Sequence, residues 1–139
     1  MDIADRVVTE VAWVGTNDLI VKETDRAASR ERAAHFDFAE AASSGIRGGV
    51  VTRDTDWVKL DGGWAETGQY VHGIDAFSAS SSAAGTLPEG YLDIVPDSSG
   101  YSHIALFSPA NEKEPLFLTS GEWEIDGGVQ AVDIERKLM

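Results

Sequence analysis

Apolar and aromatic residues come along this chain in short runs, separated by clusters of Gly, Asp, Asn and Ser. Short runs rich in Val, Ile, Phe, Tyr and Trp are typical of β-strands, and the small polar clusters are typical of turns. The first part of the chain is therefore predicted to form four strands, at residues 8–14, 19–24, 33–38 and 49–53. Residues 15–18 are predicted to form the tight turn of a hairpin between the first two strands.

The third of these runs alternates polar and aromatic side chains. Because successive side chains of a strand point to opposite faces, we expect Phe36 and Phe38 to point inward, with His35 and Asp37 on the other face. The polar residues 25–32 before this strand are predicted to form a loop rather than a helical turn. The small residues 39–45 after it are also predicted to form a loop.

A second set of strands is predicted over residues 63–120. An inner strand is expected at 63–66, and well-patterned strands follow from 91, at 103–107 and at 116–119. Residues 62–90 contain an insertion, whose Ser- and Ala-rich part at 77–86 is predicted to be a flexible loop without a chemical role. After Gly127 and Gly128, a run at 129–134 is predicted to begin a third set.

A weak internal repeat supports this grouping of the strands. The order apolar, apolar, Thr, turn, acidic residue, Trp occurs twice, at 50–57 and at 117–123. A Trp after an outer strand can pack against a neighbouring sheet, so Trp57 and Trp123 are interpreted as structural rather than ligand-stacking. We therefore predict an all-β, partial β-propeller with a blade at 8–53, a second at 63–120 and the start of a third at 127–139.

Residues 100–125 combine two strands, their turns and a terminal Trp. The motif consists of Gly100, Tyr101, His103, Ile104, Thr119, Gly121, Trp123, Glu124 and Ile125. Its order and spacing resemble the propeller of the dipeptidyl peptidase IV family. Segments 9–14, 19–23, 63–66 and 91–96 are similar to the fungal branch, called dipeptidyl aminopeptidase B. Together the repeat and the resemblance give nine structural-motif residues: Trp13, Trp57, Trp64, Tyr101, His103, Thr119, Gly121, Trp123 and Glu124.

The resemblance implies that the chain is a non-catalytic propeller segment of a serine dipeptidyl aminopeptidase of the prolyl oligopeptidase family. At 139 residues it is too short for a whole propeller with a catalytic domain, so we expect a piece of a longer protein. The implied partners are the remaining blades, an α/β-hydrolase domain and, in that context, peptide substrates. The implied location of the parent is the vacuolar membrane or the cell exterior.

The sequence holds no candidate catalytic residues of its own. The Gly-x-Ser-x-Gly motif of a nucleophilic serine is absent, and His35, His72 and His103 lie on different predicted elements without a triad context. We interpret His103 as a structural residue, hydrogen-bonded across the blade. The acidic pair with which the family holds a substrate amine is not carried over to Glu40, Glu66 or Glu89, so the substrate-binding residues stay unassigned.

The composition excludes several other functions. The formal net charge of −13 makes nucleic acids and anionic membranes unfavourable partners. The chain has no Cys, and the acidic stretch that begins at Asp54 has Val58 and Lys59 where a calcium loop needs an oxygen ligand and a Gly. We expect no metal, no cofactor, and no signal or membrane-spanning segment.

Two alternatives remain open. One is a small β-rich module that binds peptides or proteins without any link to a peptidase, and the other is a free-standing β-sandwich. Blades without neighbours would also have open strand edges, through which the chain could self-associate.

Overall fold

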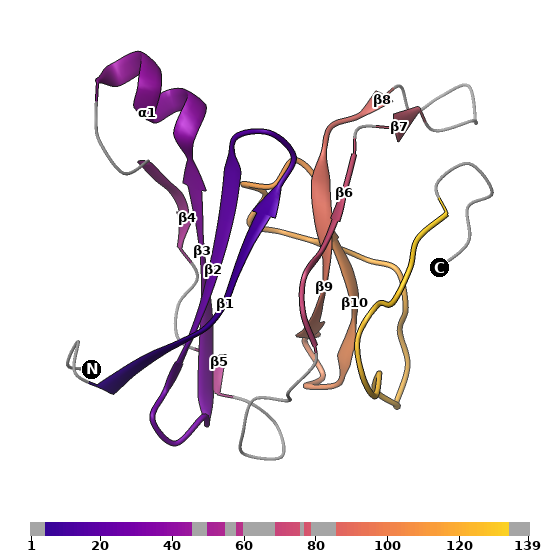
Figure 1. Ribbon diagram of the computed structural model, residues 1–139. Coiled ribbons are helices and arrows are strands. Elements are labelled where there is room, and N and C mark those ends of the chain that lie inside the picture. The colour runs from indigo at the N-terminus through magenta and orange to yellow at the C-terminus, as the bar shows by residue number, and fades with distance from the viewer. Residues whose placement is uncertain are drawn as a thin grey trace. The chain divides into compact units, whose positions relative to one another are not determined.

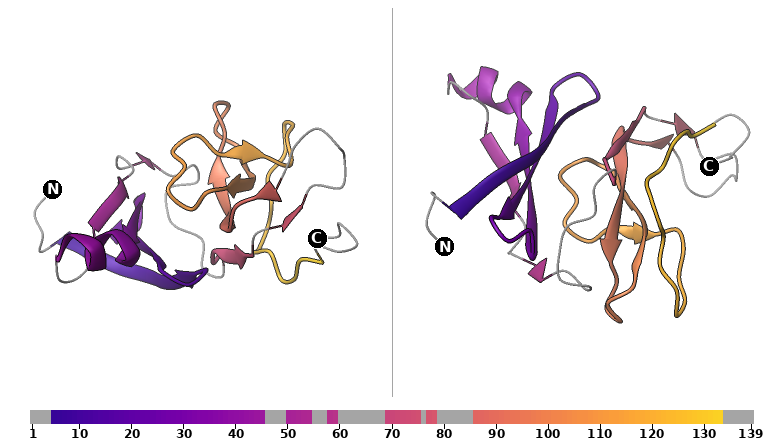
Figure 2. Two further views of the ribbon diagram at one scale, coloured as in Figure 1. Left: turned by 90° about the horizontal axis from the view of Figure 1, so that it is seen from above. Right: turned by 60° about the horizontal axis from the view of Figure 1, so that its bottom comes forward.

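The computed structural model describes residues 5–45, 50–54, 58–59, 69–75, 77–78 and 86–133. The chain divides into two compact units, Met1–Glu66 and Thr67–Met139. Each unit contains an antiparallel sheet (Figures 1 and 2). Over these described residues the fold is all-β apart from one short helix, and its sheets are consistent with a partial propeller.

The sheet of the first unit follows the chain in simple up-and-down order. Its strands are β1 (Arg6–Val14), β2 (Asp18–Asp25), β3 (Arg30–Asp37) and β4 (Val50–Asp54), paired in the order β1-β2-β3-β4. The short β5 (Val58–Lys59) pairs with β3 beside β4. The predicted set of four antiparallel strands is thus confirmed, with a fifth short strand added.

Asp25 holds the turn between β2 and β3. Its carboxylate accepts hydrogen bonds from the Ser29 amide at 2.7 Å, the Ser29 hydroxyl at 2.8 Å and the Arg30 amide at 3.2 Å. The turn contains Ala28 in the left-handed region, at a φ of 53°. These bonds replace backbone pairing in the turn. The expected loop is confirmed over residues 26–29 but is wrong at its ends, because Asp25 belongs to β2 and residues 30–32 belong to β3.

The loop expected at residues 39–45 is wrong, because helix α1 (Phe38–Ser44) lies there. Its Ala and Glu residues favour a helix, and the left-handed Gly45, at a φ of 72°, follows its last residue. The Phe38 amide donates to the Asn17 carbonyl at 2.9 Å, and its ring lies 5.3 Å from that of Trp13. Tertiary contacts with the β1–β2 hairpin therefore hold the start of the helix.

The expected inward face of β3 is also wrong. His35 is 1% exposed, whereas Phe36 is only partly buried and Phe38 lies in the helix. His35 lies opposite the fully buried Ile20, and its Nε2 lies 2.5 Å from Asp18 Oδ1. Because this partner satisfies the ring nitrogen, the polar side chain can occupy the buried face.

A second buried polar residue lies on that same face. Lys22 is 4% exposed, and its Nζ lies 3.8 Å from a carboxylate oxygen of Glu10 and 3.8 Å from one of Glu31. The two carboxylates come from the strands on either side of β2. Charge pairing across three strands thus accompanies apolar contact in this sheet.

The sheet of the second unit has the order β11-β10-β9-β6. The strands are β6 (His72–Ile74), β9 (Gly90–Pro96), β10 (Ser102–Phe107) and β11 (Leu116–Phe117), and β7 (Phe77–Ser78) pairs with β8 (Thr86–Leu87) in a separate hairpin. The last three strands of the predicted second set are confirmed. The inner strand expected at 63–66 lies outside the described residues, and the described inner strand is β6.

The loop expected at 77–86 is wrong at its two ends, which pair as β7 and β8; residues 79–85 lie outside the described part. Sequence reading also missed β6, because His72 and Gly73 carry no strand signal. Cross-strand hydrogen bonding to β9 decides its conformation instead.

The core of the second unit is formed by Ile74, Leu92 and Leu106, and Val129 and Val132 pack against it. Up to Asp133, the run at 129–134 forms only a single bridge residue rather than a strand. The first strand of a third blade therefore stays a prediction.

The charge of Asp25 makes the β2–β3 turn sensitive to pH. The Ser29 hydroxyl, followed by the amides of Ser29 and Arg30, holds the pKa of the Asp25 carboxyl below its ordinary value. A lowered folded-state pKa contributes stability above the unfolded value of about 4, and that contribution is lost as pH falls through the lowered value. Urea unfolding between pH 2 and pH 7 should therefore show a smaller acid-dependent loss of stability in Asp25→Asn than in wild type, and an equal loss would contradict the role of the Asp25 carboxylate.

Candidate functional site

A tight turn at residues 97–100 precedes β10. The Asp97 carbonyl accepts from the Gly100 amide at 3.0 Å, and Asp97 Oδ1 accepts from the amides of Ser99 and Tyr101 at 2.8 and 3.2 Å. Gly100 adopts a φ of 90°, which a residue without Cβ reaches without strain. The short Asp-Ser-Ser-Gly sequence thus sets the register of the β9–β10 hairpin.

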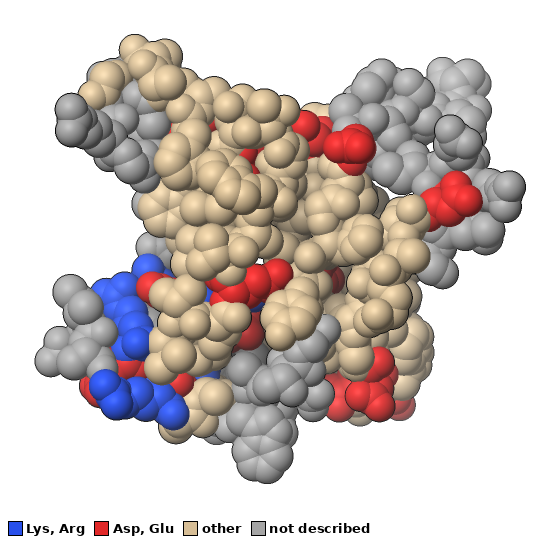
Figure 3. Space-filling view, viewed as in Figure 1, with Lys and Arg blue, Asp and Glu red and all other residues tan. Residues whose placement is uncertain are grey.

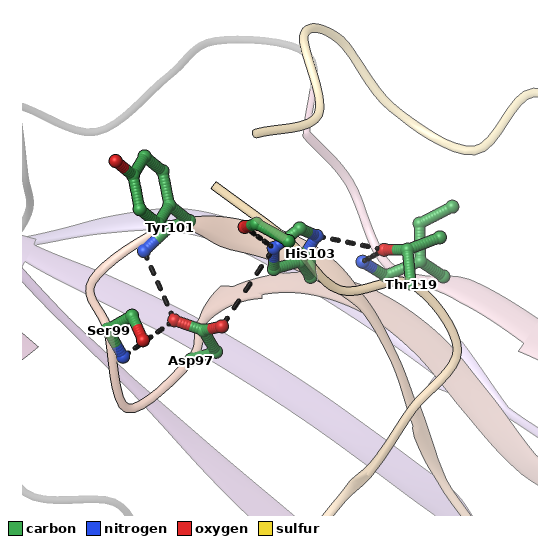
Figure 4. A network of polar contacts seen from close by, with 7 residues as sticks. Asp97, Ser99, Tyr101, His103 and Thr119 are labelled. Atoms are coloured by element: carbon green, nitrogen blue, oxygen red, sulfur yellow. Dashed lines mark hydrogen bonds and ion pairs between the residues drawn. The ribbon is translucent and has the colours of Figure 1, made fainter. Parts of the chain in front are cut away.

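His103 lies at the centre of the polar network in Figure 4. Its side chain is fully buried, with Nδ1 3.1 Å from Thr119 Oγ1 and Nε2 3.1 Å from the Gly121 carbonyl oxygen. Asp97 Oδ2 lies 3.9 Å from Nε2. Both nitrogens of the ring are therefore bound by the chain segment that follows β11.

The partners determine which ring nitrogen carries the hydrogen. A carbonyl oxygen only accepts, so Nε2 donates to Gly121. Thr119 Oγ1 already accepts from the Ile104 amide at 3.1 Å, which leaves its own hydrogen for Nδ1. With the Nε2–H tautomer, each of these donors has an acceptor.

Backbone bonds on both sides of His103 fix the returning segment. The Leu118 amide donates to the Ile104 carbonyl at 2.8 Å, and the Ile125 amide donates to the Ser102 carbonyl at 2.9 Å. Residues 119–124 consequently form a loop beside the imidazole. We call His103, Thr119, Gly121 and Trp123 the His103 clasp.

Trp123 and Gly121 complete the clasp, Trp123 through a ring contact with His103 and Gly121 through its lack of a Cβ. The Trp123 ring meets His103 edge to face, with centroids 5.0 Å apart and an interplanar angle of 89°. Gly121 has a φ of 131°, and a Cβ at this position would lie 2.6 Å from Trp123 Nε1. The Thr-x-Gly-x-Trp spacing thus has a physical reason, because the left-handed residue must also leave room for the indole.

The structure unites four of the nine predicted motif residues in the His103 clasp. Tyr101 and Glu124 flank the clasp in sequence, and their side chains are exposed. Trp13 is on β1 of the first unit and is 62% exposed. Trp57 and Trp64 lie outside the described residues. The sequence analysis missed Asp97, although its Asp-Ser-Ser-Gly turn signal was visible.

The clasp encloses the imidazole of His103. A His, a Thr and an Asp lie together, but the imidazole is fully buried and both of its nitrogens are occupied by Thr119 and Gly121. A general base needs a nitrogen within reach of a substrate proton. Over the described ranges, we find no group of three His, Cys, Asp or Glu that could hold a metal ion. Nor does the described part include a helix with the length and apolar character to cross a membrane.

Comparison with known proteins identifies the family. The model of the family "Dipeptidyl peptidase IV (DPP IV) N-terminal region" matches residues 1–139. The chain belongs to this family. It is 35% identical over 135 residues to probable dipeptidyl-aminopeptidase B of Coccidioides posadasii, and 36% identical to the proteins of that name from Uncinocarpus reesii and Tuber melanosporum.

These matches cover 97% of this chain but only 14% of each of the three relatives. The resemblance that the sequence analysis based on residues 100–125 is confirmed, including its fungal branch. The residues of the His103 clasp lie inside the matched region of this dipeptidyl peptidase IV N-terminal chain.

Removal of the Thr119 hydroxyl should weaken the clasp. Thr119→Val leaves the buried Nδ1 of His103 and the Ile104 amide without their partner, so the free energy of unfolding should fall by about 1–3 kcal/mol. Urea titration followed by circular dichroism measures this loss. Thr119→Ser keeps the hydroxyl and should lose less than half as much; an equal loss would show that the hydrogen bonds are not the cause.

The conformation of Gly121 gives a second test. Gly121→Ala adds both the strain of a left-handed residue, about 1–2 kcal/mol, and a clash with Trp123. Gly127→Ala is the matched control, because Gly127 also has a positive φ, of 88°, but its Cβ would meet nothing within 4 Å. Thermal unfolding should show the larger loss for Gly121→Ala, and equal losses would contradict the role of Trp123.

Proposed function

We propose that this chain is a non-catalytic segment of the β-propeller of a serine dipeptidyl aminopeptidase of the prolyl oligopeptidase family. In the longer protein, its blades form part of the wall of the chamber through which peptide substrates reach the catalytic domain. The observation that carries the proposal is the family match over the whole chain, together with one multi-stranded antiparallel sheet in each unit. Blades of four strands are the building blocks of propellers.

The residues of the chain support a scaffold role. Hydrolysis by a serine enzyme of the α/β-hydrolase type needs a nucleophile elbow, and the 139 residues contain no Gly-x-Ser-x-Gly. Of the histidines, His35 is paired with Asp18 and His103 lies in the clasp. These two buried, hydrogen-bonded side chains are thus used for packing.

The charge of the chain supports a contribution to substrate entry. A net charge of −13 gives the surface a negative potential, which attracts the positively charged amino end of a peptide. Binding by an extended strand edge is a second way in which such a wall could hold peptides.

The isolated chain should not cleave dipeptide substrates. With X-Pro and X-Ala chromogenic dipeptides, we expect release of the chromophore at the buffer rate, because the nucleophile is missing. Turnover that co-purifies with the 139-residue chain and resists further purification would contradict the proposal.

A chimera tests the role in the longer protein. The matched 135 residues of the Coccidioides posadasii relative are replaced by this chain, and the chimera is assayed for folding and for cleavage of the same dipeptides. Retained cleavage supports the propeller role, and a folded but inactive chimera contradicts the chamber role. The untouched relative is the reference.

A second candidate function is a peptide- or protein-binding module with no peptidase link. The observation in its favour is the exposed apolar surface of β1, which is an edge strand of its sheet. Four of its side chains are at least 45% exposed: Val7, Val8, Val11 and Trp13. Sedimentation and denaturation of the isolated chain distinguish the two functions. A stable monomer with a single cooperative transition favours the module, and self-association or non-cooperative unfolding favours the propeller segment.

A further inference from the structure

A short glycine-rich link joins two fixed parts of the second unit. Residues 126–128, with the sequence Asp-Gly-Gly, form neither a helix nor a strand. Just before them, the Ile125 amide donates to the Ser102 carbonyl at 2.9 Å. Just after them, Val129 packs against the core of the unit. The link is therefore irregular in structure but held at both ends.

An Asp-Gly pair is a sequence at which a peptide chain readily cyclises. The amide nitrogen of the glycine attacks the Cγ atom of the aspartate side chain, and the product is a cyclic imide, a succinimide. Glycine favours this step because it has no Cβ to crowd its nitrogen. The chain contains two such pairs, at 61–62 and 126–127, and the second pair lies within the described residues.

The structure leaves room for this reaction at Asp126 and Gly127. Asp126 is exposed. Gly127 has a φ of 88°, and a Cβ built on it would meet nothing within 4 Å. Because glycine passes readily between positive and negative φ, the link can turn its nitrogen toward the carboxyl group without displacing a neighbour. Both reacting groups therefore lie in open surroundings.

Exposure of a carboxylate alone does not single out Asp126, because Asp and Glu side chains lie at several separate places on the face shown in Figure 3. Other aspartates are held in place. The carboxylates of Asp25 and Asp97 each accept hydrogen bonds from amides of their own turns. Asp93 is 3% exposed, and the residue after it is the branched Ile94. Cyclisation at these three positions would break hydrogen bonds or disturb the core.

We infer that Asp126–Gly127 is a modification site of the folded protein, at which the main chain passes spontaneously from the α- to the β-carboxyl group of Asp126. The inference is independent of the proposed function. The Gly127 nitrogen forms a bond to Cγ of the protonated carboxyl group, and the amide hydrogen leaves with the carboxyl OH as water. A succinimide remains.

Hydrolysis of the succinimide completes the change. Addition of water at Cγ breaks the new bond to nitrogen and restores aspartate. Addition of water at the α-carbonyl carbon breaks the original peptide bond instead and leaves isoaspartate, in which the chain continues through Cβ and Cγ. One water leaves and one returns, so the composition of the chain is unchanged, and nothing is oxidised or reduced.

Isoaspartate changes the link in two ways. It adds the Cβ of residue 126 to the main chain, and it moves the free carboxylate to the α-position. Because Ile125 and Val129 are both held, the longer link must bend outward or release Val129 from the core. The isomerised protein should therefore unfold at a lower temperature than the unmodified protein.

The test compares isomerisation in the folded and in the guanidinium-unfolded chain at neutral pH. Trypsin then separates the two Asp-Gly pairs, because Lys113 lies between them. Liquid chromatography with electron-transfer fragmentation measures isoaspartate at each position. The folded rate should lie within about threefold of the unfolded rate at Asp126, but at least about tenfold below it at Asp97, whose turn must first open.

Asp126→Glu is the matched control. Glutamate keeps the charge, but its longer side chain closes the corresponding ring far more slowly, so isomerisation at position 126 should no longer be detected. After the same incubation of the folded proteins, the midpoint of thermal unfolding should fall further in wild type than in Asp126→Glu.

Three results would overturn the inference. A folded rate at Asp126 more than about threefold below its unfolded rate would show that the folded link is closed to the reaction. Equal folded and unfolded rates at Asp97 as well would show that the structure does not select the site. An equal fall of the midpoint in wild type and Asp126→Glu would refute the effect on the link. The proposed function would stand in all three cases, because it does not depend on Asp126.

Discussion

The second unit depends on one requirement, namely that the buried imidazole of His103 must have hydrogen-bond partners on both nitrogens. A polar ring at zero exposure is costly unless it is satisfied. Thr119 and Gly121 supply the partners, and they do so only if the chain after β11 turns back beside β10. The chain after the short strand β11 therefore stays beside β10, where backbone hydrogen bonds of Leu118 and Ile125 fix it at both ends.

The first unit uses the same principle with charged groups. His35 is buried against Asp18, and Lys22 is buried between Glu10 and Glu31. Such pairs add little net stability relative to apolar residues, but removal of one partner leaves an unsatisfied buried group. Both sheets therefore combine apolar packing with polar contacts that accept only one register, since a slip of one residue would turn these groups to the other face.

These features explain how the family relationship and the missing chemistry fit together. The dipeptidyl peptidase IV N-terminal family model matches residues 1–139, and the His103 clasp within them holds the segment after β11 beside β10. On β1 of the first unit, Val8, Val11 and Trp13 are 54%, 61% and 62% exposed.

The sequence by itself determined the strands with a strong local signal and the turns between them. β1, β2, β9 and β10 follow from runs of β-branched and aromatic residues, and Asp25 and Asp97 belong to clusters typical of turns. The motif around His103 also gave the family. Strands and turns of this kind depend on residues that are close together in the chain, so the local sequence pattern predicts them.

Only the tertiary structure decided which face of β3 is buried, that a helix follows it, and that His72–Ile74 is a strand. His35 is inside because Asp18, far away in the sequence, lies next to it, and α1 begins where Phe38 meets Trp13 and Asn17. β6 exists through its pairing with β9. Each outcome depends on a partner that is distant along the chain, and such a partner leaves no mark in the local pattern of hydrophobic and polar residues.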